Sequence, residues 1–140
     1  MQVVIPEMIL KEDLKFPIRT KKCKLILSHA AYDLTNGFYN DTENVVIDIV
    51  YNDQDPKFPA FSTIFDLHPG CFSVVSISVQ FIETTFIGDN FINDKDFNPV
   101  AILSCYIVDG IADKSITENW HEMNFKNYQM PQLLPPAAIE

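Results

Sequence analysis

His68 and Cys71 are the two residues of this sequence whose types and spacing most readily suggest chemistry. A histidine and a cysteine three positions apart could supply half of a zinc site, or a thiol nucleophile beside its base. A zinc site needs a second close pair of ligands, which the sequence lacks, and catalytic Cys–His pairs are normally distant in sequence. Pro69-Gly70 between them has the residue types of a type II turn. We therefore interpret the motif as a turn between two antiparallel strands.

Calcium is the metal that the sequence favours over others. Two Asp-x-Asp pairs, Asp53 with Asp55 and Asp94 with Asp96, fall in polar stretches between predicted strands. Calcium takes several carboxylate oxygens, and loops at one end of a β-sandwich can bring such pairs together. The second pair does not continue as an EF-hand loop, because Pro99 stands where glycine is required. Asp is also common in ordinary turns, so a pair of solvated loops is the competing interpretation.

Other cofactors and catalytic groups find no support in the sequence. Its four glycines are too widely spaced to form a dinucleotide-binding or phosphate-binding loop. Glu118-x-x-His121 is half of a di-iron motif, but the second half and the additional glutamates are missing. We therefore expect a protein that uses no cofactor and is not an enzyme.

Strands are predicted wherever apolar residues alternate with polar ones. Residues 101–108 are apolar at successive positions, which is typical of a central strand covered on both faces. Phe72 and Val74 fall on the opposite parity from Val75, which predicts a β-bulge near residues 74–75. The strands with clear alternation are 22–28, 44–51, 62–67 and 75–81.

These features predict a mainly β chain, folded as a single-domain antiparallel β-sandwich or an open barrel. Ser115-x-x-Glu118 forms a capping box, which predicts one short C-terminal helix. The two ends of the chain carry prolines and are expected to be extended, the first with at most one edge strand. The predicted segments are an extended N-terminal arm (1–21), a β core (22–112), a short helix (113–127) and a Pro-rich extended tail (128–140).

The charge of the chain is strongly negative but uneven. The net charge is −9, yet residues 1–24 carry six of the ten basic residues against three acidic ones. The acidic remainder repels phosphate, so we expect no nucleic-acid partner. No stretch is apolar for long enough to span a membrane, and the first residues do not resemble a signal peptide. Three widely spaced cysteines suit a reducing compartment, so we expect the protein in the cytoplasm, or assembled there into a particle.

Among the classes of protein considered, the sequence favours a structural or assembly protein most. Extended terminal arms are common in virion shells, tail assemblies and closed homo-oligomers, where they reach onto neighbouring subunits. The second hypothesis is an acidic binding antagonist, such as an immunity protein or a nucleic-acid mimic that inhibits a basic partner. The third is a calcium-dependent binding module. The expected partner is another protein or another copy of the chain. The aromatic residues expected to contact it have polar neighbours and lie in predicted loops: Phe58, Phe61, Phe91 and Phe97.

Overall fold

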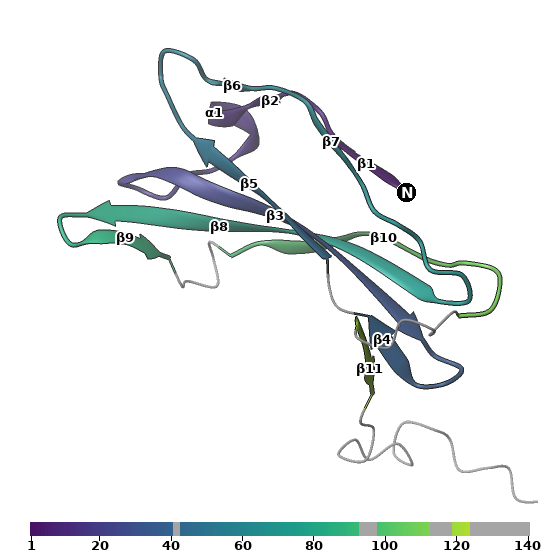
Figure 1. The fold of residues 1–140 in the computed structure, drawn as a ribbon. Coiled ribbons are helices and arrows are strands. Elements are labelled where there is room, and N and C mark those ends of the chain that lie inside the picture. Colours follow the sequence, from purple (N-terminus) through teal and green to yellow (C-terminus); the bar gives the residue numbers. More distant parts are fainter. Residues whose placement is uncertain (41–42, 93–97, 113–118, 124–140) are drawn as a thin grey trace, which may run out of the picture.

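Two long strands, β3 (Thr20–Asp33) and β8 (Phe72–Thr85), form the centre of the structure. Each has 14 residues, and they pair antiparallel along most of their length. The computed structural model describes residues 1–40, 43–92, 98–112 and 119–123, of which 60% lie in strands. The large antiparallel sheet built on the central pair curls into a half-barrel (Figure 1).

Shorter strands flank the central pair on both sides, and all of them are antiparallel to their neighbours. β5 (Glu43–Val50) and β4 (Phe38–Asn40) pair with β3, and β11 (Trp120–Glu122) pairs with β4. On the other side, β10 (Val100–Ile107) and β9 (Gly88–Phe91) pair with β8. Among the described strands, β10 therefore forms one edge of the large sheet.

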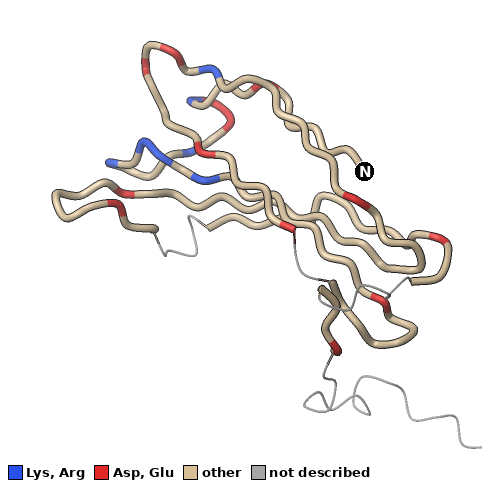
Figure 2. The backbone as a smooth tube through the Cα atoms, in the orientation of Figure 1, with Lys and Arg blue, Asp and Glu red and all other residues tan. Residues whose placement is uncertain are grey.

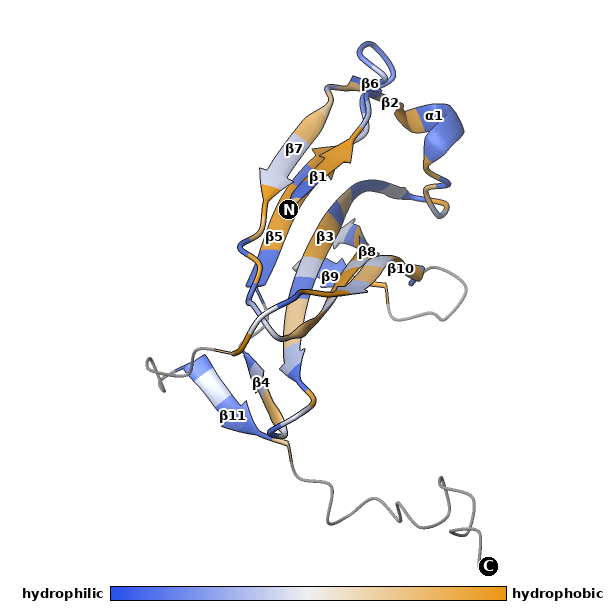
Figure 3. Cartoon of the chain, turned by 90° about the vertical axis from the view of Figure 1, so that its right-hand side faces the viewer, coloured by the Kyte–Doolittle hydropathy of each residue, from blue (hydrophilic) through white to orange (hydrophobic). Residues whose placement is uncertain are grey.

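Several short elements lie over one face of the large sheet, which we call the inner face (Figures 1 and 3). They form two small antiparallel sheets, β1 with β7 and β2 with β6, and one helical turn. The opposite face of the large sheet is called the outer face below. The short elements are β1 (Gln2–Ile5), β2 (Met8–Ile9), α1 (Leu10–Asp13), β6 (Lys57–Phe58) and β7 (Phe61–Ile64).

The hydrophobic core fills the space between the inner face and these short elements. Cys23, Leu25 and Leu27 of β3 point into it and are at most 3% exposed. This alternation arises because successive strand side chains point to opposite faces. The inward residues predicted for strands 22–28 and 44–51 are thus confirmed, and so are those of 75–81. The buried cluster comprises Leu10, Cys23, Leu25, Leu27, Ile47, Ile49, Phe65, Val75, Val79 and Phe81.

The N-terminal residues 1–21 pack on the chain's own body. Our prediction of an extended arm with at most one edge strand was wrong, because this segment contains β1, β2 and α1. Val3 and Ile5 alternate with exposed neighbours and pack against the core, and Leu10 is only 1% exposed. Pro6 does not prevent this arrangement, since it lies between β1 and β2, where no strand hydrogen bond needs its missing N–H.

In the described part of residues 113–127, the structure has a strand in place of the predicted C-terminal helix. Trp120–Glu122 form strand β11, which pairs with β4. A capping box is a local signal, whereas the open edge of β4 is created by residues far away in the sequence, and here the edge determines the local structure. Residues 113–118 and 124–127, together with the predicted tail 128–140, lie outside the described residues.

The turn predicted at His68–Cys71 is present. Gly70 has a positive φ of 72°, and the Cys71 N–H donates to the His68 carbonyl at 3.3 Å. The turn does not join two paired strands, however, because β7 pairs with β1 and leads from a small sheet into the large one. The bulge predicted near residues 74–75 does not lie in β8, which keeps a regular register with β3 there. The register of β8 with β10 does shift opposite Val75 and Ser76, and the extra residue belongs to β10.

Replacement of Gly70 by Ala is expected to destabilise the protein more than replacement of Gly37 by Ala. Both glycines have positive φ, but a Cβ at Gly70 would lie 2.7 Å from the Ala112 nitrogen, whereas a Cβ at Gly37 would meet nothing within 4 Å. The Gly37 variant therefore reports the backbone conformation alone, at about 1 kcal/mol, and we expect Gly70→Ala to cost about 2–4 kcal/mol. Chemical denaturation measures both, and equal losses would contradict the close packing at Gly70.

Candidate functional site

Strand β10 is an exposed apolar edge. Its sequence, VAILSCYI, has no charged residue, and every residue except Tyr106 is exposed. Val100, Ile102 and Ile107 are 70%, 68% and 75% exposed. We predicted a central strand covered on both faces for residues 101–108, and this was wrong. Successive apolar residues fit both a covered strand and an apolar edge, and only the pairing, which is to β8 alone among the described strands, separates the two.

A β-bulge determines which side chains of β10 point to which face. The register with β8 shifts between Ile102 and Ser104, so that Leu103 is the extra residue. The bulge changes the alternation and turns Tyr106 to the inner face, opposite Ser73. There the Tyr106 hydroxyl donates to the Met1 sulfur. Ile102 and Ile107 both remain on the outer face despite the odd spacing between them.

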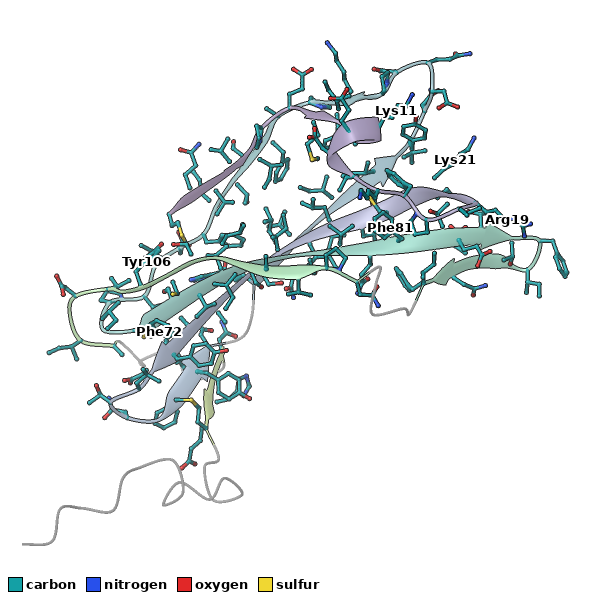
Figure 4. The ribbon with its side chains drawn as sticks, turned by 180° about the vertical axis from the view of Figure 1, so that it is seen from behind. Lys11, Arg19, Lys21, Phe72, Phe81 and Tyr106 are labelled. Atoms are coloured by element: carbon teal, nitrogen blue, oxygen red, sulfur yellow. The ribbon has the colours of Figure 1, made fainter. Side chains whose placement is uncertain are left out.

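The outer face carries a further group of apolar side chains next to β10. Phe72 pairs with Ile107 on one side and with Tyr32 on the other, and Tyr32 pairs in turn with Tyr39. Phe72 and Tyr32 are partly exposed. Figure 4 shows Phe72 and Tyr106 on opposite sides of the sheet. We call the group the outer apolar patch, and it comprises Ala30, Tyr32, Phe72, Val74, Ile102, Cys105 and Ile107.

His68 and Cys71 do not form an exposed reactive pair. Cys71 is 0% exposed. His68 Nε2 lies 3.1 Å from the Asn40 side-chain nitrogen, and its ring is packed edge-on to Trp120 with centroids 5.5 Å apart. The His68 side chain therefore ties the turn to β4 and β11.

His29 is a buried histidine on the inner face of β3. It is 2% exposed, and its ring lies 5.3 Å from that of Phe65 and 6.5 Å from that of His68. Its Nε2 atom and the Ser73 hydroxyl have no hydrogen-bond partner among the described residues. Burial lowers the pKa of His29; Glu43 opposes this, while His68 and the Met1 amino group add to it.

The predicted calcium ligands are only partly placed. Asp53 and Asp55 lie exposed in the loop between β5 and β6, and Asp53 accepts a hydrogen bond from Tyr51. Asp94 and Asp96 lie outside the described residues. Within the described ranges, no group of three or more His, Cys, Asp or Glu side chains is arranged to hold a metal ion. A calcium site built from both pairs stays a prediction.

The predicted contact aromatics separate into different environments. Phe58 and Phe61 lie in β6 and β7 rather than in loops, and both are half-buried against the core. Their predicted position in loops is therefore wrong, and their rings pack on the core between the small sheets and the large one. Their contact with a partner stays a prediction. Phe91, on β9, is 59% exposed. Phe97 lies outside the described residues.

Comparison with known proteins gives no further information on this surface. No model of a protein family matches the sequence, and no characterised protein or solved structure that was compared with it matches either. Within the described part of the chain, no helix is long and apolar enough to cross a membrane.

Acidification is expected to destabilise the folded protein through His29. In the unfolded chain His29 takes up a proton near pH 6.5, whereas the folded state resists protonation because its pKa is lowered. The contribution of His29 to stability is therefore complete above about pH 6.5 and is lost as the pH falls below it, by at most about 1.4 kcal/mol per pH unit. Urea denaturation between pH 5 and 8 measures this loss.

The control for this experiment removes the titrating group itself. His29→Phe should flatten the stability curve below about pH 6.5, because phenylalanine takes up no proton. An unchanged slope in the His29→Phe protein would exclude His29 as the titrating group.

Proposed function

We propose that this protein is a non-enzymatic assembly subunit that joins other protein chains through strand β10. In this proposal the small sheets and the large sheet act as the two layers of a β-sandwich, and the free edge of the large layer receives a strand from a partner. The partner is another copy of the chain or another protein, and the assembly takes place in the cytoplasm without nucleic acid or membrane.

The observation that carries this proposal is the edge of β10, with which no described strand other than β8 pairs. Edge strands present unpaired backbone N–H and C=O groups, and natural proteins normally protect them with charged residues, proline or a covering segment. Val100–Ile107 contains neither a charge nor a proline, and all of its side chains except Tyr106 are exposed. Addition of a strand would pair the free backbone groups and cover the side chains together.

The free energies of burial and association indicate that a partner must cover the outer apolar patch as well as β10. Complete burial of each large aliphatic side chain contributes about 1.5–3 kcal/mol. Four such residues, Val100, Ile102, Leu103 and Ile107, are between 46% and 75% exposed. Their burial therefore offers roughly 6–12 kcal/mol at most, against an association cost of about 4–15 kcal/mol. A stable contact accordingly covers Phe72 and Tyr32 as well.

Two other functions are less well supported. An acidic binding antagonist, whether an immunity protein or a nucleic-acid mimic, needs a dense acidic face, whereas Asp and Glu are spread along the described chain in Figure 2. A calcium-dependent binding module needs Asp53 and Asp55 to meet further ligands, and no such group occurs within the described ranges.

Replacement of Ile102 by Lys is expected to weaken the assembly. The new charge lies in the middle of the apolar edge, where pairing with another strand would bury it without a partner. We expect at least about a tenfold loss of association, corresponding to about 1.4 kcal/mol. Light scattering on the purified full chain over a range of protein concentrations measures the change, with co-purifying proteins identified in parallel.

Phe86→Lys provides the matched control, because Phe86 is 99% exposed between β8 and β9 and lies outside β10. It should associate like the parent protein. The proposal is wrong if Phe86→Lys and Ile102→Lys behave alike, or if the parent chain is monomeric and purifies alone.

A further inference from the structure

A second surface feature lies away from β10, where α1 and the segment after it meet the start of β3. A pocket of about 550 Å³ opens there. Its apolar wall is formed by Leu10, Phe16 and Tyr51. Phe16 is held in place by aromatic contacts, with ring centroids 5.6 Å from Tyr51 and 5.3 Å from Phe81. This wall is therefore part of the packed structure and exists without a ligand.

Three lysines, Lys11, Lys15 and Lys21, line the same pocket, and no carboxylate does. Lys21 lies at the register shift of β3, and its side chain is on the side of the sheet that faces α1 (Figure 4). Asp13 of the helical turn accepts a hydrogen bond from the Ile9 N–H at 2.7 Å. The pocket thus combines an apolar wall with positive charge.

The charge of these lysines is not neutralised within the described part of the chain. Lys22, Lys24 and Lys57 each lie within 4.0 Å of an acidic side chain, at 3.4, 2.7 and 3.8 Å. No such ion pair is present in the described structure for Lys11, Lys15 or Lys21. The net charge of the chain is −9, so a cluster of positive charge is unusual for it. Figure 2 shows the basic residues gathered near α1 and the start of β3.

The turn that contributes Pro17 and Thr20 to the pocket has an unusual backbone conformation. Arg19 is the one described residue other than glycine with a positive φ, 68°. It sits in a turn closed by the Thr20 hydroxyl, which donates to the Pro17 carbonyl at 2.6 Å. Such conformations cost about 1 kcal/mol or more and are retained where the surrounding structure enforces them. The turn keeps Pro17 and Thr20 in the wall of the pocket.

We propose that this pocket binds a small anionic amphiphile: a molecule with an apolar body and a carboxylate or phosphate head. The apolar body would lie against Leu14, Phe16 and Tyr51, and the head would contact the lysine amines. The volume falls within the range of small-molecule sites, about 300–1,000 Å³, and such sites are mainly apolar with a few polar groups. A nucleic acid would instead need basic groups spread along its backbone and would leave the apolar wall unused.

Calorimetric titration of the full chain with decanoate tests the proposal at low salt, below the micelle concentration. Decyl phosphate, decyltrimethylammonium and acetate serve as comparison ligands. We expect one molecule of decanoate or decyl phosphate to bind, with weak binding of the cation and of acetate. The ratio of decanoate to decyl phosphate affinity distinguishes a carboxylate from a phosphate ligand. Equal affinity for the cationic amphiphile would overturn the proposal.

Substitution of the lysines tests the assignment of the site. The double variant Lys15→Gln with Lys21→Gln should bind decanoate about three- to thirtyfold more weakly, since exposed charge pairs contribute a few tenths to 1 kcal/mol each. Lys57→Gln is the control, because it removes a lysine that is paired with Glu7 outside the pocket. Circular dichroism verifies folding. Undiminished binding by the double variant, or tighter binding of single-stranded DNA than of decanoate, would refute the site.

Discussion

The antiparallel pairing of β3 with β8 is the constraint on which the rest of the structure depends. All other strands of the large sheet pair with one of these two, except β11, which reaches β3 through β4. The register between them also places Leu25 and Leu27 inward beside Val79 and Ile77. A slip of one residue would exchange the inner and outer faces, moving Lys24 into the core and Leu25 into solvent. One register thus determines both the hydrophobic core and the outer apolar patch.

The amount of this fold that could be predicted depends on how local each signal is. Strict alternation located β3, β5 and β8 and the core residues that they contribute, because period two is a property of the strand itself. The turn at Gly70 was predictable because its signal, Pro69-Gly70, is also local. The edge position of β10, the strand at Trp120 and the folding back of residues 1–21 all depend on which partner edge is available, and that is set by distant residues.

The candidate sites likewise combine features that are visible locally in the sequence with features that depend on distant residues. The absence of charge over Val100–Ile107 is visible in the sequence, but it indicates a contact surface only once β10 is known to be an edge. The concentration of basic residues near the N-terminus is likewise visible, whereas the pocket forms only when Leu10 and Phe16 fold over Tyr51. For Phe58 and Phe61 the opposite error arose, since polar neighbours suggested loops, yet both rings pack against the core.

The sequence separation within the central pair has a consequence for the order of folding. Tyr32 pairs with Phe72 and Thr20 pairs with Glu83, so residues that pair between the two strands are 40 to 63 positions apart in the sequence. By contrast, His29 pairs with Glu43, and β5 follows β3 closely in the chain. Local pairs close at a smaller entropy cost, so the β3–β5 hairpin is available first. During synthesis, at about 5–20 residues per second, β3 therefore remains without its partner strand for several seconds, until β8 has been synthesised.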